Sequence, residues 1–203
     1  MSYLEERDCE WSMMTAPAQE PLTLDEAKLQ ASVTQDDENL LVVGYLKAAR
    51  EAAQSFLNRA LFTQTWKLQI AGFDDVIWLP MAAPLQSVTS VQYYDENGTP
   101  QTLATSYYDV DTVSEPGRIV RKPNQTYPTV QSDRLRPVTV TYVCGWTDVD
   151  LIPEAIKQGI RVYLTAFEGG RAGQTFDIAQ KAAEACWIQA GQVFWRAPEC
   201  LYR

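Results

Sequence analysis

The spacing of the apolar residues changes twice along this chain, and these two changes constrain the fold more than any other feature. Up to about residue 60, apolar side chains recur every three or four residues, as in amphipathic helices, and the same spacing returns after about residue 152. Between these points apolar and polar residues alternate, which is typical of half-buried strands. The sequence therefore predicts helices at both ends and a block of strands in the middle.

The first helical region carries a start signal and one long amphipathic segment. Thr23 followed by Glu26 fits a capping box, which predicts a short helix over about 24–32. A longer helix is predicted over 37–59, because acidic residues crowd its N-terminus, where negative charge is favoured. Its apolar residues form two neighbouring stripes, one of Leu41, Tyr45, Ala49, Ala52 and Phe56 and one of Val42, Leu46, Ala53 and Leu57. Its polar side is assigned to Lys47, Arg50, Glu51, Gln54 and Asn58.

The middle block reads as six or seven short strands separated by turn residues. Asn97-Gly98, between two runs rich in Tyr, Thr and Val, is a strong signal for a β-hairpin. Strands at this spacing suggest a small antiparallel sandwich or barrel. Trp66, Trp78 and Tyr142 are expected in its core.

Together these patterns predict an α+β fold in which an antiparallel β-domain, sandwich-like or barrel-like, is inserted into a helical bundle. The helical domain is expected to be discontinuous, over 21–60 and 150–190, with the inserted domain over 61–149. Residues 1–20 have no period and are expected to be a flexible arm. Residues 191–203 are expected to form a C-terminal tail.

The composition excludes most catalytic chemistry. The chain of 203 residues contains no histidine, which removes Ser-His-Asp and Cys-His arrangements. The carboxylate pairs Asp109/Asp111 and Asp148/Asp150 lie at strand ends or in loops. Aspartate is common there because its side chain stabilises turns by hydrogen bonds to the backbone. A calcium site over 109–115 lacks the glycine and ligand spacing of an EF-hand. We therefore expect no enzyme activity, no metal and no cofactor.

The four cysteines are expected to be reduced. Cys9, Cys144, Cys186 and Cys200 include no CxxC pair, which leaves zinc and redox motifs without local support. The N-terminal residues are acidic and lack the apolar run of a signal peptide, so cysteines that pack as small hydrophobic side chains are favoured over a disulfide framework.

The net charge of −9 is distributed unevenly. Residues 1–60 hold eleven acidic and five basic residues, whereas residues 115–137 hold five basic and two acidic ones. An acidic protein is a poor candidate for gripping nucleic acid through its phosphates. The acidic surface is either a solvated face or a surface that repels a polyanion or meets a basic partner. No apolar run is long enough to predict a membrane span.

The C-terminal segment combines aromatic and basic residues. Trp187, Phe194, Trp195 and Tyr202 occur there with Arg171, Arg196 and Arg203. Aromatic and arginine side chains are the usual anchors of protein interfaces. Contact with a partner and packing within the chain are both consistent with this pattern.

The order of several segments resembles the tailed-phage head-tail connector family, whose members are also called adaptors or head-completion proteins. The resemblance covers about 21–168 and is closest to the longer members, in which a β-domain interrupts a helical core. The segments are PLTLDEAKLQ, DDENLL, FLNRALFTQTWKLQI, LPMAAPLQSVTSVQYYDENGTPQTL, YYDVDTVSEPGRI, VTVTYVCGW and IPEAIKQGI, in that order.

The resemblance implies a structural role in the neck of a virion assembled in a bacterial cytoplasm. Such adaptors form a ring at the portal vertex, expected to follow the twelve-fold portal. They extend the DNA channel and offer a docking surface to tail or stopper proteins. The implied partners are therefore the portal protein, tail or stopper proteins and further copies of this chain, while the packaged DNA passes through without specific binding. No reaction is catalysed.

Two groups of residues are assigned to this role. Acidic side chains that would line the channel and keep DNA mobile are Asp36, Asp37, Glu38 and Glu51. Residues expected to bind the portal, as the tails of related adaptors do, are Trp187, Phe194, Trp195, Arg196, Leu201, Tyr202 and Arg203.

Two other classes of protein remain as alternatives. The exposed Tyr and Trp side chains of a carbohydrate- or surface-binding β-module would stack on sugars, but such modules usually stand at chain ends or behind linkers. A tail-terminator or stopper-type virion protein would be expected to be mostly β, which the long helix at 37–59 argues against.

Overall fold

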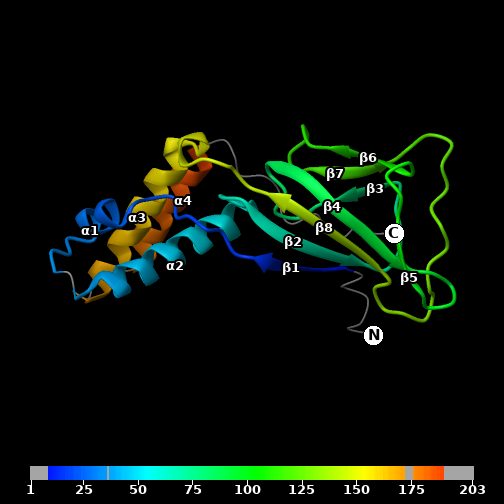
Figure 1. Ribbon diagram of the computed structural model, residues 1–203. Coiled ribbons are helices and arrows are strands. Elements are labelled where there is room, and N and C mark those ends of the chain that lie inside the picture. The colour runs from blue at the N-terminus through cyan, green and yellow to red at the C-terminus, as the bar shows by residue number, and fades with distance from the viewer. Residues whose placement is uncertain (1–8, 36, 172–175, 190–203) are drawn as a thin grey trace, which may run out of the picture. The chain divides into compact units, whose positions relative to one another are not determined.

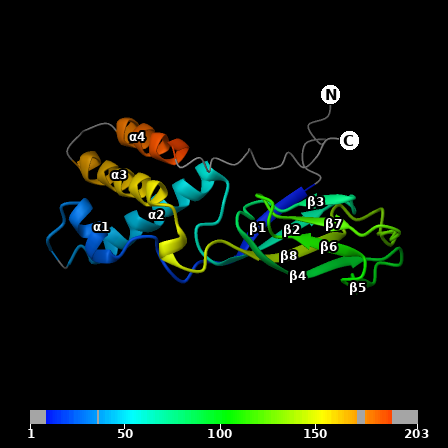
Figure 2. The ribbon, with the colours of Figure 1, turned by 90° about the horizontal axis from the view of Figure 1, so that it is seen from above.

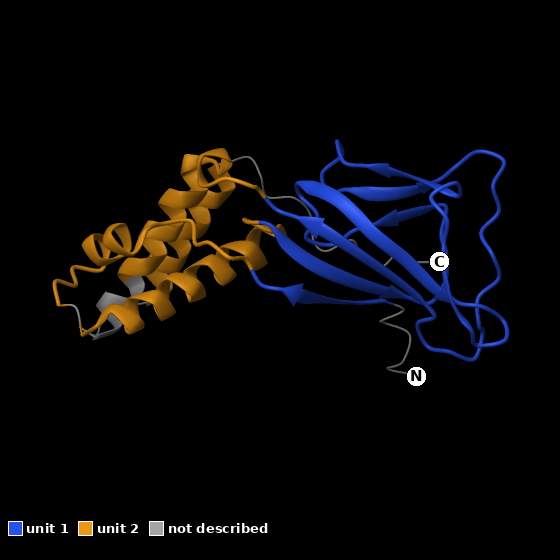
Figure 3. Cartoon of the chain, viewed as in Figure 1, with its two compact units in different colours: residues 1–16, 63–145, 196–203 blue, residues 17–62, 146–195 orange. Residues whose placement is uncertain are grey.

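The computed structural model describes residues 9–35, 37–171 and 176–189. The chain divides into two compact units, each built from separate stretches (Figure 3). One unit contains residues 17–62 and 146–195, and we call it the helical unit. The other contains residues 1–16, 63–145 and 196–203, and we call it the β-unit.

In the described residues, the helical unit contains helices α1 to α4 and one turn of 3-10 helix (Figure 1). Helix α3 packs against α4, α2 and α1. Aliphatic side chains of α2 and α3 form most of the core, and Trp187 of α4 completes it. The elements are α1 (Leu24–Gln30), α2 (Asn39–Leu57), η1 (Val149–Leu151), α3 (Glu154–Arg171) and α4 (Phe176–Gln189).

The predicted start of α1 is confirmed as a capping box. The Thr23 hydroxyl accepts a hydrogen bond from the Glu26 amide at 3.2 Å, and the Thr23 amide donates to the Glu26 carboxylate at 2.8 Å. These two bonds satisfy amide groups that have no partner inside the helix. Helix α2 ends at Leu57 and is capped by Asn58, whose left-handed backbone (φ 52°) lets the Arg59 amide donate to the Gln54 carbonyl at 3.2 Å.

Of the two predicted stripes on α2, the one that contains Val42 faces the core. Val42, Leu46, Ala53 and Leu57 are buried, whereas Leu41 of the other stripe is partly exposed. Ala49 is buried as well. The predicted polar side is partly wrong, because Arg50 and Gln54 are buried. The Gln54 side-chain carbonyl accepts a hydrogen bond from the Leu61 amide at 3.1 Å and so holds the chain as it leaves α2.

The β-unit contains two open antiparallel sheets (Figures 1 and 2). The larger sheet has the order β1-β2-β8-β4-β5, and the smaller sheet has the order β3-β7-β6. The α+β class predicted from the sequence is confirmed, with open sheets rather than a closed barrel in the described residues. The strands are β1 (Cys9–Thr15), β2 (Gln64–Ile70), β3 (Val76–Trp78), β4 (Leu85–Tyr94), β5 (Pro100–Thr102), β6 (Tyr108–Asp111), β7 (Arg118–Arg121) and β8 (Val138–Cys144).

The core of the β-unit follows the alternation in β8. Val138, Val140, Tyr142 and Cys144 are buried, and the residues between them are only half-buried. The Tyr142 hydroxyl donates a 2.6 Å hydrogen bond to the Pro80 carbonyl, which satisfies its one polar group. Trp66 and Trp78, also expected in this core, are only half-buried.

Two expectations for the N-terminal residues differ from the structure. Residues 9–15 lie within the segment expected to be a flexible arm, but they form β1, which pairs with β2 from Cys9↔Ile70 to Thr15↔Thr65. Cys9, expected to be reduced, is disulfide-bonded, whereas Cys144 and Cys186 are free.

The chain enters and leaves the middle part of the β-unit at neighbouring positions. At the start of β2, Gln64 pairs with Cys144 at the end of β8. Just outside these strands, Phe62 and Trp146 of the helical unit form a bridge. The segment 63–145 therefore begins and ends at adjacent points.

Candidate interaction surfaces

The acidic residues assigned to a channel wall do not form one patch. Asp37 and Glu38 precede the first turn of α2, and Asp36 lies outside the described residues. Glu51 is thirteen residues beyond Glu38, which corresponds to about 20 Å along the helix and roughly 140° around it. The structure therefore brings Asp37 and Glu38 together and separates Glu51 from them.

Two leucines, one at this end of α2 and one on α1, are exposed, which was not predicted from the sequence. Leu40 is 86% exposed and follows Glu38 by two residues, and Leu29 near the end of α1 is 83% exposed. The exposure of Leu29 could have been predicted, because a helix as short as α1 packs along only one face. Exposed apolar side chains of this kind suit contact with another protein chain, so this part of the helical unit carries apolar as well as acidic surface.

Arg50 acts inside the helical unit rather than on its surface. Its Nε donates to the Glu20 carboxylate at 2.8 Å, and its side chain is almost fully buried. A buried charge is tolerated only when it is paired in this way. The pair fastens the segment before α1 to the middle of α2.

The basic segment 115–137 is neutralised by the β-unit itself. Most of its basic side chains lie within ion-pair distance of an acid, and Arg134 stacks on the ring of Tyr94 with 3.6 Å between guanidinium and ring centroid. Such internal pairing leaves little positive charge for phosphates. The pairs are Arg118–Asp111 (2.9 Å), Arg121–Asp75 (2.7 Å), Lys122–Asp109 (3.4 Å) and Arg136–Glu10 (3.8 Å).

Asp111 organises the turn between β6 and β7. Its carboxylate accepts hydrogen bonds from the Ser114 hydroxyl (2.6 Å), the Ser114 amide (3.0 Å), the Val113 amide (3.1 Å) and Arg118 Nε (2.9 Å). The bonds from Ser114, joined by those from Arg118 and Val113, hold the pKa of Asp111 well below its ordinary value. The turn is therefore ordered around an ionised carboxylate.

Acid should weaken the β-unit through this carboxylate. Because the folded-state pKa of Asp111 is lowered, its contribution is complete above the pKa of the unfolded chain, about 4, and is lost as the pH falls below it. We expect Asp111→Asn to flatten the fall in melting temperature between pH 5 and pH 3, measured by circular dichroism. Asp133→Asn, an exposed aspartate of the same unit, should leave the pH profile unchanged. An Asp111→Asn profile identical to wild type would contradict this role.

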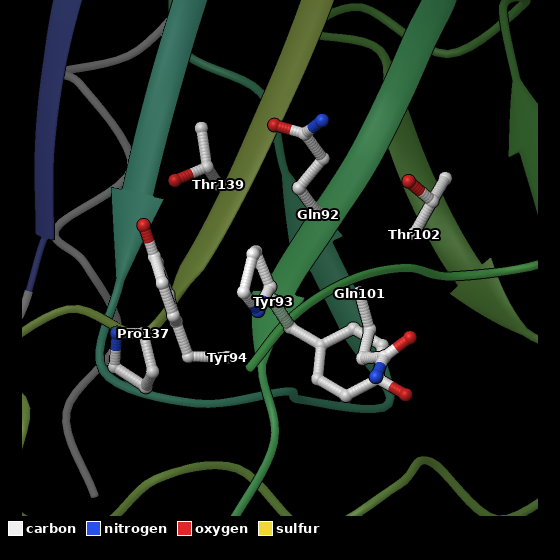
Figure 4. Close-up of a pocket in the computed structure, with 8 residues that line it drawn as sticks. Gln92, Tyr93, Tyr94, Gln101, Thr102, Pro137 and Thr139 are labelled. Atoms are coloured by element: carbon white, nitrogen blue, oxygen red, sulfur yellow. The ribbon is translucent and has the colours of Figure 1, made fainter. Parts of the chain in front are cut away.

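A small cavity lies on the β-unit near the β4–β5 hairpin (Figure 4). Its volume is about 130 Å³, well below the roughly 300 Å³ or more of typical ligand sites. Arg134 covers one face of Tyr94, which a sugar ring would need for stacking. The cavity therefore gives little support to the carbohydrate-binding alternative. Its lining residues are Gln92, Tyr93, Tyr94, Pro100, Gln101, Thr102, Pro137 and Thr139.

A stacked aromatic cluster anchors the loop after β7. The ring centroids of Phe73 and Tyr127 are 4.6 Å apart, and those of Phe73 and Tyr93 are 5.6 Å apart. Burial raises the pKa of Tyr127 to about 12. These tyrosines are thus occupied by packing within the β-unit.

Trp187, the first residue assigned to portal binding, lies in the core of the helical unit. It is 1% exposed, its ring lies 5.4 Å from that of Phe56 and 6.1 Å from that of Tyr163, and its Nε1 donates to the Ile156 carbonyl at 3.3 Å. This position gives Trp187 a packing role and leaves it no surface for a partner. The other assigned residues, Phe194, Trp195, Arg196, Leu201, Tyr202 and Arg203, lie outside the described residues.

Most of the carboxylates considered as catalytic candidates have partners within the chain. Asp109 and Asp111 are engaged in ion pairs, and the Asp148 carboxylate accepts a hydrogen bond from the Asp150 amide. In the described ranges no group of three His, Cys, Asp or Glu could hold a metal ion. Burial raises the pKa of the Cys144 thiol, which makes that cysteine unreactive. None of the helices described here is long and apolar enough to cross a membrane.

The fold combines a helical unit with two antiparallel sheets, whose strands β2 to β8 are inserted between its helices in the sequence. Residues 21–115 match the family described as phage gp6-like head-tail connector protein. This match confirms the resemblance to tailed-phage head-tail connectors that the sequence indicated. No curated protein matches the chain.

Solved structures of gene transfer agent particles share this fold. A chain in the structure titled "Neck of empty GTA particle computed with C6 symmetry" has a TM-score of 0.65 at 17% identity, over 78% of this chain and 83% of that chain. A chain in "Virion of native gene transfer agent (GTA) particle" has a TM-score of 0.63 at 18% identity, over 77% and 82%. A third, in "Neck of native GTA particle computed with C12 symmetry", has a TM-score of 0.58 at 16% identity, over 87% and 94%.

Proposed function

We propose that this protein is a structural head-tail adaptor that forms a ring beneath the portal of a phage-like particle. The observation that carries the proposal is the connector-family match over 21–115, on a fold shared with chains from the necks of gene transfer agent particles. The ring would extend the DNA channel and offer tail or stopper proteins a docking surface. Its role is mechanical, and it needs no catalytic residue.

A ring of twelve copies is the arrangement that the comparison favours. One of the neck structures with this fold was computed with C12 symmetry. In a closed ring each copy contacts its two neighbours through two different surfaces.

We propose further that the acidic end of α2 faces the channel. Asp37 is exposed and Glu38 is half-buried just before the first turn of α2, so this end of the helix presents negative charge toward solvent. Like charge would keep DNA mobile in the channel, whereas arginines and lysines without acidic partners would hold its phosphates. Glu51 lies further along α2 and on a different side of the helix from Glu38, so it forms a separate acidic position in this proposal.

The test is to co-express this chain with the portal protein encoded beside it and to image the purified particles by cryo-EM. We expect a ring of this chain stacked coaxially on the portal, with Asp37 and Glu38 toward the lumen. A portal purified without this chain, although the chain is well folded, would reject the adaptor role. A ring with both acids on its outer wall would reject only their place in the channel.

Removing the C-terminal tail should abolish portal binding. We expect a chain truncated after residue 190 to keep the helical circular dichroism of the full chain, because Trp187 and the core around it remain. It should nevertheless fail to co-purify with the portal, since Phe194, Trp195, Arg196, Leu201, Tyr202 and Arg203 are lost. The matched control, Ile188→Ala, changes an exposed residue of α4 and should bind normally. Full portal binding by the truncated chain would contradict the assignment of the tail.

A further inference from the structure

We propose that neighbouring copies join by strand pairing, with the outer edge of β1 in one copy against the outer edge of β6 in the next. This inference rests on the proposed ring, because it states which surfaces of the β-unit meet there. It is drawn from the four edge strands of the two sheets, which are β1, β5, β3 and β6.

Two of the four edges are protected against pairing and two are not. Strand β5 has three residues and begins with Pro100, which has no amide to donate, and β3 has three residues and is followed closely by Pro80. Short length and proline are the usual ways in which proteins blunt a sheet edge. Strand β1 has seven residues and β6 has four, and neither contains proline or lysine. Within the described residues, no strand pairs with the outer edge of β1 or of β6.

The two open edges have the placement that a closed ring requires. Strand β1 ends the larger sheet and β6 ends the smaller one, and Figure 1 shows them at opposite edges of the β-unit. A ring contact is heterologous, so each copy must offer two different surfaces that point toward different neighbours. Pairing β1 with β6 meets this condition, whereas pairing β1 with β1 would form a closed dimer.

Apolar side chains would meet on the inner face of the joined sheet. On β1, Met13 lies opposite Trp66 on the face that points to the core, and it is 42% exposed because no strand covers its other side. On β6, Val110 lies opposite the buried Ile119 and is also partly exposed. Side chains opposite each other on paired strands contact directly, so the pairing would cover Met13 with Val110.

Opposite charges would meet on the outer face. Lys67 of β2 lies beside Ser12 of β1 and has no ion pair with any described residue. Asp109 points outward from β6, where its side chain is 69% exposed and 3.4 Å from Lys122. The new pairing would bring Asp109 toward Lys67, and its exposed carboxylate would then lie between Lys122 of its own copy and Lys67 of the neighbour. Glu10, the acid on the same face of β1, is occupied by Arg136 at 3.8 Å.

The turn after β6 is built to present an apolar side chain. Val113 is 91% exposed, although the hydrogen bonds to Asp111 hold its backbone in one conformation. A contact that is ordered before binding costs less conformational entropy when it forms. Met14, exposed at the irregular register of β1, is an adaptable apolar counterpart.

The contact would be weak for a single pair of copies. A pairing limited by the four residues of β6 buries less than the roughly 800 Å² per partner of a typical stable interface. The ring would therefore form where the portal holds many copies close together, which raises their effective concentration.

The experiment introduces cysteines on the two edges and asks whether they cross-link on the portal. The full chain carrying Met14→Cys and Val113→Cys is bound to the co-expressed portal, oxidised mildly and run on a non-reducing gel beside wild type, which controls for the native cysteines. We expect a ladder of covalent oligomers. A mixture of the two single variants should stop at dimers, because each copy then carries only one of the two partners. Met14→Cys combined with Leu135→Cys, another exposed apolar position of the β-unit, should give no ladder.

Different outcomes would reject the β1–β6 interface and the adaptor role. Rings that form on the portal while the Met14→Cys/Val113→Cys chain gives no more cross-linking than the Leu135→Cys control would overturn the β1–β6 pairing and leave the adaptor role intact. Absence of the wild-type chain from the portal would overturn both. A second variant, Val113→Asp, places a charge in the apolar contact and should reduce the number of copies bound per portal. An unchanged number of bound copies would also count against the β1–β6 pairing.

Discussion

Replacing Trp187 with alanine should destabilise the helical unit by about 3–5 kcal/mol, the usual cost of truncating a buried aromatic side chain. Trp187 is almost fully buried between Phe56 of α2 and Tyr163 of α3, so its loss leaves a large cavity where three helices meet. The Ile156 carbonyl also loses its hydrogen bond from the indole. Urea unfolding followed by circular dichroism at 222 nm would measure the change, since the helical unit holds the long helices.

The neighbouring residue provides the matched control for this prediction. Ile188 is a large apolar residue on the same helix, but it is 59% exposed. Ile188→Ala should therefore change the unfolding free energy by no more than about 0.5 kcal/mol. Equal losses for the two variants would show that Trp187 does not lie in the core. A large loss for Trp187→Ala alone would also explain any failure of that variant to bind the portal through misfolding.

A glycine-to-alanine change should have opposite effects in two helices of the same unit. Alanine is favoured over glycine in helix interiors by about 1 kcal/mol. At Gly44 in α2 an added Cβ would meet no atom within 4 Å, so Gly44→Ala should stabilise the unit by up to that amount. At Gly159 in α3 the Cβ would lie 2.1 Å from Trp187 Nε1 and 2.4 Å from Trp187 Cδ1. Gly159→Ala should therefore destabilise by about 1–3 kcal/mol or more, because the indole must move.

A second variant, Trp187→Leu, tests whether contact with Trp187 causes the destabilisation by Gly159→Ala. If Trp187 is the obstacle, Gly159→Ala should lose most of its cost in a Trp187→Leu chain, where the indole is absent. The coupling between the two changes, measured by a double-mutant cycle in urea, should then be clearly different from zero. Additive effects, or a stabilising Gly159→Ala in the natural background, would contradict the close packing of α3 on α4.

The elements that could be predicted from the sequence are those whose signals are local. The capping box at Thr23 and Glu26, the alternation from Val138 to Cys144 and the hairpin at Asn97-Gly98 each depend on residues a few positions apart. Strand β1 could not be predicted in this way, because it has no clean alternation and depends on pairing with β2, whose partner residues lie fifty or more positions later. Arg50 was misplaced for the same reason, since its partner Glu20 comes from another segment.

The candidate surfaces were harder to predict than the fold. An aromatic residue near the C-terminus has the same appearance in the sequence whether it anchors a partner or fills a core. The space for Trp187 is created by Gly159, which is distant in the chain. The basic residues of 115–137 form a charge run in the sequence, yet their acids come from β1, β6 and the loop before β3. Such pairings are properties of the sheet topology rather than of any local motif.

The adjacent entry and exit of the segment 63–145 have a consequence for how the helical unit can form. Gln64 pairs with Cys144, and Phe62 forms a bridge with Trp146, so a folded β-unit holds the two flanking ends together. The entropy of closing a loop rises with its length, but a segment that is already folded acts as a short link between its ends. Helices α2 and α3, far apart along the chain, would then search for each other as if a tight turn joined them. Segments of different length, or with different outer surfaces, could occupy this position during evolution without disturbing the helices, provided that their two ends meet.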